Sequence, residues 1–313
     1  MSVLTNVPNL VSTEETTERR HWLQVWLVTG ACILSLACVT AYGFDYYWLS
    51  AADRPYSPKH VMLRPSGVLG VKLGIAGVVF FLLLFLYPLR KKIPWLARRG
   101  TAKHWLDFHI VLGMTAPALI AFHASFKFHG IAGMAFWIML MVALSGLVGR
   151  YLYAQVPRSI NTAELSLREL AEQENELTGI LAGQNVLTIS ALEPFLHAPS
   201  PDEVKRMPAL RALLVMMMLD LSLPFRIARL RRSFLGPMGK LASLGGLLST
   251  GNRKLEDVVR TARRKASLSK RIAFLAQTQH VLHLWHVIHR PFSYSFAVLA
   301  VIHIAVAMGL GFM

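Results

Sequence analysis

The stretch HRPFSYSFAVLAVIH, residues 289–303, has a histidine at each end and no charged residue after Arg290. It is apolar enough for a bilayer interior, where a polar side chain is costly and needs a reason to be present. The stretch HIVLGMTAPALIAFH, residues 109–123, repeats the pattern with the same interval between its two histidines. In an α-helix this interval is about 40° short of four full turns and covers about 21 Å. The two histidines of each stretch therefore face nearly the same way at different depths.

Composition places both stretches in a membrane protein. Of the 313 residues, 54% are hydrophobic and 16% are charged, whereas soluble domains have about 25% charged residues. Several uncharged runs approach the length of about 20 residues that spans a bilayer core. The sequence thus predicts an all-α integral membrane protein. The net charge is +16, and the basic residues that produce it lie between the apolar runs. This position indicates basic cytoplasmic loops and not a nucleic-acid-binding surface.

The apolar runs predict five transmembrane helices that form a bundle. They cover residues 22–43, 67–87, 104–126, 130–153 and 286–313. We expect four parts along the chain. They are a cytoplasmic N-terminal segment (1–21), four spans (22–153), a basic helical cytoplasmic region (154–282) and the fifth span (283–313).

Lysine and arginine predict the orientation. The connection 90–103 and the segment 150–271 are strongly basic, whereas the loop 44–66 is not. Basic loops stay in the cytoplasm, so the N-terminus is expected inside and the C-terminus outside. The first apolar run is long and lacks a cleavage site, so we expect no removable signal peptide. A bacterial inner membrane is the expected location.

Two segments of the cytoplasmic region have helical patterns. Residues 162–183 predict an amphipathic helix. Residues 209–234, ALRALLVMMMLDLSLPFRIARLRRSF, are first apolar and then basic, and Asp220 and Pro224 interrupt them too early for a span. This segment fits an interfacial helix on anionic lipid. A helix buried within the cytoplasmic region fits equally well.

The third and fifth spans run in the same direction, so their histidines match in depth. The inner pair is His109 and His289, and the outer pair is His123 and His303. Neutral imidazoles on two parallel helices are suited to bind a haem iron from both sides. The pattern therefore predicts two b-type haems, one above the other. Histidines that only bridge helices are the alternative. A proton relay would need carboxylates, and the span interiors contain none.

Four further residues lie near the expected inner haem. His104 and His286 are about 100° away from the ligand faces, so we expect them to support the site or contact a propionate, although His286 is also an alternative to His289 as ligand. Arg150 and Arg290 have the chemistry to pair with propionates or to act as interfacial anchors. His21 is expected to be solvated.

Small residues also mark the second span. The glycines at positions 67, 70, 74 and 77 lie on one helical face. Such a face lets another helix approach closely, and we consider contact with a flat cofactor the less common reason.

Three motifs strengthen the haem hypothesis. HWLDFHIVLG (104–113), GRYLYAQVPRS (149–159) and LWHVIHRPF (284–292) resemble the transmembrane cytochrome b core of the ferric reductase and NADPH oxidase family, and a group of bacterial inner-membrane cytochromes of this kind. The resemblance implies that the four paired histidines are axial haem ligands. The sequence departs from the family because no sixth span follows His303 and no flavin- or nicotinamide-binding domain is present.

The expected function follows from these features. The two cysteines, Cys32 and Cys38, form no CxxC motif, which argues against c-type haem, iron–sulfur clusters and structural zinc. We expect a di-haem cytochrome that transfers electrons across the membrane, as a subunit of a larger oxidoreductase system. Its partners would be electron donor and acceptor proteins or a quinone. A haem-free anchor or assembly subunit is the alternative, and a proton-coupled transporter is a weaker one.

Overall fold

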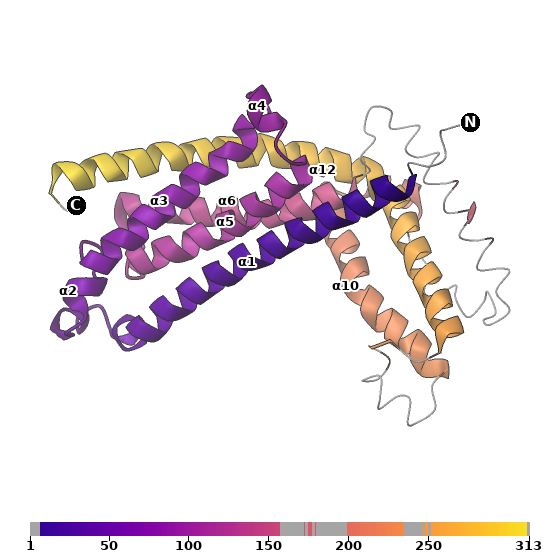
Figure 1. The fold of residues 1–313 in the computed structure, drawn as a ribbon, viewed down its shortest axis with the longest axis horizontal. Coiled ribbons are helices and arrows are strands. Elements are labelled where there is room, and N and C mark those ends of the chain that lie inside the picture. The colour runs from indigo at the N-terminus through magenta and orange to yellow at the C-terminus, as the bar shows by residue number, and fades with distance from the viewer. Residues whose placement is uncertain are drawn as a thin grey trace. The chain divides into compact units, whose positions relative to one another are not determined.

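The structure, a computed structural model, describes residues 7–156, 199–234 and 252–311, with isolated positions between residues 172 and 249. Every regular element in these ranges is a helix, which confirms the predicted all-α class. The elements are α1 (Val7–Trp48), η1 (Arg54–Tyr56), α2 (His60–Leu63), α3 (Val68–Leu89), α4 (Pro94–Ala97), α5 (Ala102–His123), α6 (Gly130–Gln155), α9 (Pro201–Arg206), α10 (Ala209–Phe234) and α12 (Arg253–Gly309) (Figure 1).

Five helical segments of the described ranges are long and apolar enough to cross a membrane. They are Thr16–Trp48, His60–Leu89, Ala102–His123, Gly130–Gln155 and Leu255–Gly309. Large apolar side chains such as Trp26, Leu34 and Val301 point outward from them and are more than half exposed. An aqueous surface would not tolerate so many exposed apolar side chains, whereas lipid does. The protein is therefore an integral membrane protein with the five predicted spans.

The chain divides into two compact units, which are described separately. The first consists of residues Met1–Val148 together with Ile288–Met313, and the second of Gly149–Val287. The predicted helix over residues 162–183 lies outside the described residues, apart from a few isolated positions.

Close packing of α3 against α5 organises the first unit. On α3, a Cβ atom at Gly74 would lie 2.8 Å from Nδ1 of His123, and one at Gly77 would collide with the side chain of Ile120. Both α5 residues thus occupy space that a larger side chain on α3 would fill. Gly74 and Gly77 therefore serve the helix packing that we expected of this face, and Gly74 lies directly beside one of the paired histidines, whereas Gly67 and Gly70 approach the backbone of residues 61–65 before α3.

A buried arginine closes one end of this unit. Arg54 follows α1 and is only 8% exposed. Its guanidinium donates hydrogen bonds to the carbonyl oxygens of Leu49, Tyr47 and Ser125. Ser125, which follows the last turn of α5, in turn donates to the carbonyl oxygen of Leu63. These bonds connect the loop after α1 to the turn that begins just beyond His123.

The second unit is built around α10 and the first half of α12. Leu230 of α10 packs with Leu255, Val258 and Val259 of α12 in a buried cluster. Further along, Asp220 of α10 forms an ion pair with Lys270 of α12. The hydroxyl group of Tyr151, near the end of α6, donates to the same carboxylate at 2.6 Å. Three helices thus meet at one partly buried polar contact.

Candidate functional site

The strongest contact between predicted site residues joins His123 of α5 and His303 of α12. Their ring centroids are 6.4 Å apart and their planes meet at 74°. Two imidazoles that bind one metal from opposite sides, with metal–nitrogen distances near 2 Å, have ring centroids about 6 Å apart. The spacing of this pair thus suits one metal ion between the rings, although the two residues are far apart in the sequence.

The tautomer of His123 follows from its hydrogen bond. Its Nδ1 atom lies 2.8 Å from the carbonyl oxygen of Gly70. A carbonyl oxygen only accepts, so Nδ1 carries the proton and donates. The lone pair is then on Nε2, the nitrogen that would bind a metal. Ligating histidines usually have this outer hydrogen bond, which fixes the orientation of the ring.

His109, the other paired histidine of α5, makes the same kind of hydrogen bond to α3. Its Nδ1 atom donates to the carbonyl oxygen of Leu84 at 3.2 Å, and the ring of Tyr87 lies beside it at a centroid distance of 5.2 Å. The acceptors Leu84 and Gly70 are both backbone atoms of α3, and the interval between them in the sequence equals that between His109 and His123. A single helix therefore orients both histidines of α5 in the same way.

His289 of α12 is oriented by a side chain instead. Its Nδ1 atom lies 2.8 Å from Oγ of Ser145 on α6. The hydroxyl group of Ser145 also lies 2.8 Å from the carbonyl oxygen of Val142, to which it donates its only proton. Its oxygen is then suited to accept from Nδ1–H of His289, an arrangement that leaves the lone pair of the ring on Nε2. The hydrogen bonds of three of the four predicted ligands are thus compatible with the same tautomer.

An apolar layer lies between the two levels of histidines. Phe296 is midway between His289 and His303 in the sequence, so all three lie close to one face of α12. Its ring packs edge-to-face on Phe81 of α3, with a centroid distance of 4.7 Å. It also packs against a buried cluster of α5 and α6 that contains Ala121, Phe136 and Met139. This layer keeps water away from the space between the levels.

His104 lies in a different cluster, formed with α1. Its ring stacks on His21 at a centroid distance of 3.7 Å, and its Nε2 atom is 3.9 Å from a carboxylate oxygen of Glu18. His21 is only 4% exposed and its Nε2 atom is 3.0 Å from the carboxylate of Asp107, which is also buried. The expectation of a solvated His21 is therefore wrong. The reason is that Asp107, one turn after Lys103 on α5, faces α1 and offers a buried partner.

The remaining predicted residues are His286, Arg150 and Arg290. His286 donates from Nδ1 to the carbonyl oxygen of Leu282 in its own helix, at 2.8 Å, and its ring contacts Trp285. Arg290 is exposed and Arg150 is half-buried. His286 thus donates its hydrogen bond to its own helix, whereas the hydrogen bond of His289 joins it to the neighbouring helix α6.

Sequence reasoning missed the groups that orient the histidines. The carbonyl oxygens of Gly70 and Leu84 have no signal in side-chain chemistry, although the matching interval on an adjacent antiparallel span could have revealed them. Ser145 has only the weak signal of a hydroxyl group in an apolar span, which tends to find a partner.

Comparisons of this chain with protein-family models, with curated proteins and with solved structures return no match.

Proposed function

We propose that the protein is a di-haem b-type cytochrome that transfers electrons across the membrane. The proposed axial ligands are His109 and His289 for one haem and His123 and His303 for the other. Haem iron supplies reversible one-electron chemistry. The observation that carries the proposal is the pair His123 and His303, whose rings have the separation that one shared metal ion requires.

The second site follows from the register of the two helices. His123 and His303 are in contact, and each helix has its other histidine earlier in the sequence by the same interval. In two parallel helices this places His109 and His289 at a common level about 21 Å away along the axis. The hydrogen bonds of His109 to Leu84 and of His289 to Ser145 are compatible with a lone pair on Nε2 of each imidazole, which a metal ligand needs.

The chain's own residues would do three tasks. The carbonyl oxygens of α3 and the hydroxyl group of Ser145 hold the imidazoles in the ligating tautomer. The layer of Phe296 and Phe81 excludes water between the two levels, and a dry surrounding is one of the factors that set a haem potential. Arg150 and Arg290 are proposed as propionate partners, because a guanidinium pairs with a carboxylate through two hydrogen bonds.

The proposal also includes the protein family and the location in the cell. The chain would be a member of the ferric reductase and NADPH oxidase-like cytochromes, in a bacterial inner membrane with the N-terminus inside. Electrons would pass between a cytoplasmic-side protein or a quinone and an external-side acceptor. The matching spacing of both histidine pairs supports the family proposal, and the basic segments support the orientation.

A haem-free anchor subunit is the second candidate. The observation that favours it is that three of the histidines have a hydrogen bond to a neighbouring helix. Such bonds between spans are worth about 1 kcal/mol each, which is a sufficient reason for a histidine to bridge helices.

Optical spectroscopy separates the two candidates. The purified full chain should give a reduced-minus-oxidised spectrum of the b type with about two haems per chain. Replacing His303 with Leu should remove one haem and spare the other, and His109→Leu should do the same at the second site. His129→Leu is the control, because His129 is an exposed residue in the turn before α6. A wild-type protein that takes up no haem from haem-replete cells would contradict the proposal and favour the anchor.

A further inference from the structure

Helix α10 has a face packed against α12 and, as far as the described residues show, an apolar face that they leave exposed. On the packed face, Ala212, Met216 and Leu230 are at most 2% exposed. They lie against α12, where the hydroxyl group of Thr278 contacts the sulfur atom of Met216 and Leu230 joins the buried cluster with Leu255.

The opposite face is apolar and open. Its side chains are between 43 and 69% exposed. They are Leu210, Leu214, Met217, Met218, Leu221 and Phe225. At 100° per residue they fall within a stripe about 100° wide, which is the width of a core-facing surface on an amphipathic helix. We call these six residues the apolar stripe. A stripe of this length needs a partner that is itself apolar.

The charges beside the apolar stripe are positive. Arg211 and Arg229 are exposed along one edge of the stripe, and Arg232 is exposed beyond its end. Arg231 is different, because it forms an ion pair with Glu256 on the packed side at 2.6 Å. The single acidic residue of α10, Asp220, is engaged by Lys270 and Tyr151. The surface around the stripe therefore attracts anions.

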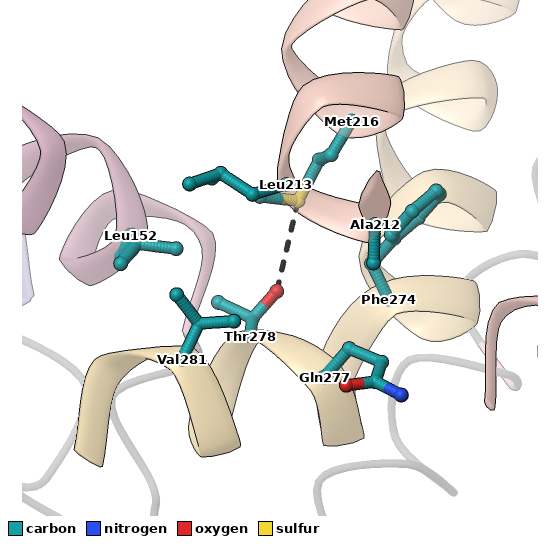
Figure 2. Close-up of a pocket in the computed structure, with 8 residues that line it drawn as sticks. All are labelled: Leu152, Ala212, Leu213, Met216, Phe274, Gln277, Thr278 and Val281. Carbon is teal, nitrogen blue, oxygen red and sulfur yellow. Dashed lines mark hydrogen bonds between the residues drawn. The ribbon is translucent and has the colours of Figure 1, made fainter. Parts of the chain in front are cut away.

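The first half of α10 is attached to the end of a membrane span. Leu152, in the last turn of the span Gly130–Gln155, is fully buried. Together with Met216 of α10 and with Phe274 and Thr278 of α12, it lines a cavity of only about 10 Å³ (Figure 2), which has room for at most one water molecule. One residue earlier, Tyr151 holds Asp220. Both contacts lie within the second unit and join α10 to the last turns of α6, the end of a candidate span, and the end of a span lies at the bilayer interface.

We propose that the apolar stripe of α10 is inserted into the headgroup boundary of the bilayer, with Arg211, Arg229 and Arg232 on the phosphate groups of anionic lipids. Interfacial helices have this combination of an apolar face, basic edges and no free acidic residue on that side. Anionic lipid attracts basic residues that lie near the membrane surface. This inference does not depend on haem binding, because it uses only residues of the second unit.

Spin-label accessibility in lipid nanodiscs tests the inference on the full chain. Cys32 and Cys38 would be replaced with Ser, and a single cysteine placed as Met218→Cys or Phe225→Cys. The label at either position should collide more often with oxygen, which concentrates in lipid, than with a water-soluble nickel chelate. Arg260→Cys is the matched control, because Arg260 is exposed on α12 and its label should prefer the nickel chelate. The ratio of the two collision rates should be several-fold higher on the stripe.

The outcomes separate lipid from the other coverings. High collision with the nickel chelate at Met218 and Phe225 would overturn the proposal in favour of water. Low collision with both reagents would also overturn it, since a protein segment or partner would then cover the stripe. Comparing discs of zwitterionic lipid with discs that contain anionic lipid tests the arginines. The ratio at Met218 should rise with anionic lipid, and Arg229→Gln with Arg232→Gln should abolish that rise. An unchanged ratio in the parent protein would refute the role given to the arginines.

Discussion

The imidazole of His123 donates a hydrogen bond to the backbone carbonyl oxygen of Gly70, 2.8 Å away on the neighbouring helix α3. Leu84 accepts the corresponding bond from His109. Because α3 and α5 are consecutive spans and run in opposite directions, the interval from Gly70 to Leu84 on one matches the interval from His109 to His123 on the other. One helix thus orients two histidines at different depths in the same way, and this repeated contact leads to the first prediction.

A larger residue at Gly74 should disturb the site of His123 and His303. The Cβ atom of Gly74→Leu would lie 2.8 Å from Nδ1 of His123, and overpacking of this kind costs about 1–3 kcal/mol. We expect the variant to lose the haem of this pair and to keep the other. The haem-to-protein ratio measures this effect. Gly30→Leu is the control, because a Cβ atom at Gly30 meets no other atom within 4 Å. Equal haem content in both variants would refute the prediction.

Ser145→Ala should weaken the binding of haem at the level of His289. The variant removes the acceptor of Nδ1–H, and loss of such an outer partner lowers metal affinity about 10–100-fold. The measurement is haem release during titration with a competing haem acceptor, together with the reduction potential of that haem. Ser293→Ala serves for comparison, since the hydroxyl group of Ser293 contacts the backbone carbonyl oxygen of His289 and not its ring. Wild-type release and potential in Ser145→Ala would contradict the role of this hydroxyl group.

Lys270→Met should destabilise the second unit. The side chain of Lys270 is 6% exposed and faces Asp220, whose side chain is 35% exposed. Removing one partner leaves a partly buried carboxylate without its cation, which costs about 3 kcal/mol. Thermal unfolding in detergent, monitored by protease cleavage within residues 149–287, measures the change. Lys205→Met removes an exposed ion pair with Asp202 and should change stability by less than about 1 kcal/mol. If the two variants unfold alike, the contact contributes little.

Arg54→Met should loosen the end of the bundle next to His123. The guanidinium donates to Leu49, Tyr47 and Ser125, and unsatisfied buried groups cost about 1–3 kcal/mol each. We expect a lower unfolding temperature and faster hydrogen exchange at residues 124–129. Arg64→Met at an exposed position should leave both unchanged. Unaltered exchange at residues 124–129 in the Arg54 variant would show that this arginine does not hold the turn.

The sequence by itself determined the class, the five spans and the equal spacing of the histidines. These features depend on local properties, namely the length of an apolar run and the helical repeat, so they need no knowledge of neighbouring helices. Asp107 and His21 show the limit of this reasoning. They are far apart in the sequence yet in contact, and a lone histidine near an interface has no local property that distinguishes a solvated ring from a buried one.

Only the tertiary structure decided how each imidazole is held and which face of α10 is open. The acceptors Gly70 and Leu84 are backbone atoms whose availability depends on how closely α3 approaches α5, and glycine at position 74 permits that approach. The apolar pattern of α10 predicts an amphipathic helix, but both sides of this helix contain apolar residues. Contacts with α12 and Leu152 select the side that packs and leave the apolar stripe exposed, because the burial of a side chain depends on its neighbours as well as on its own polarity.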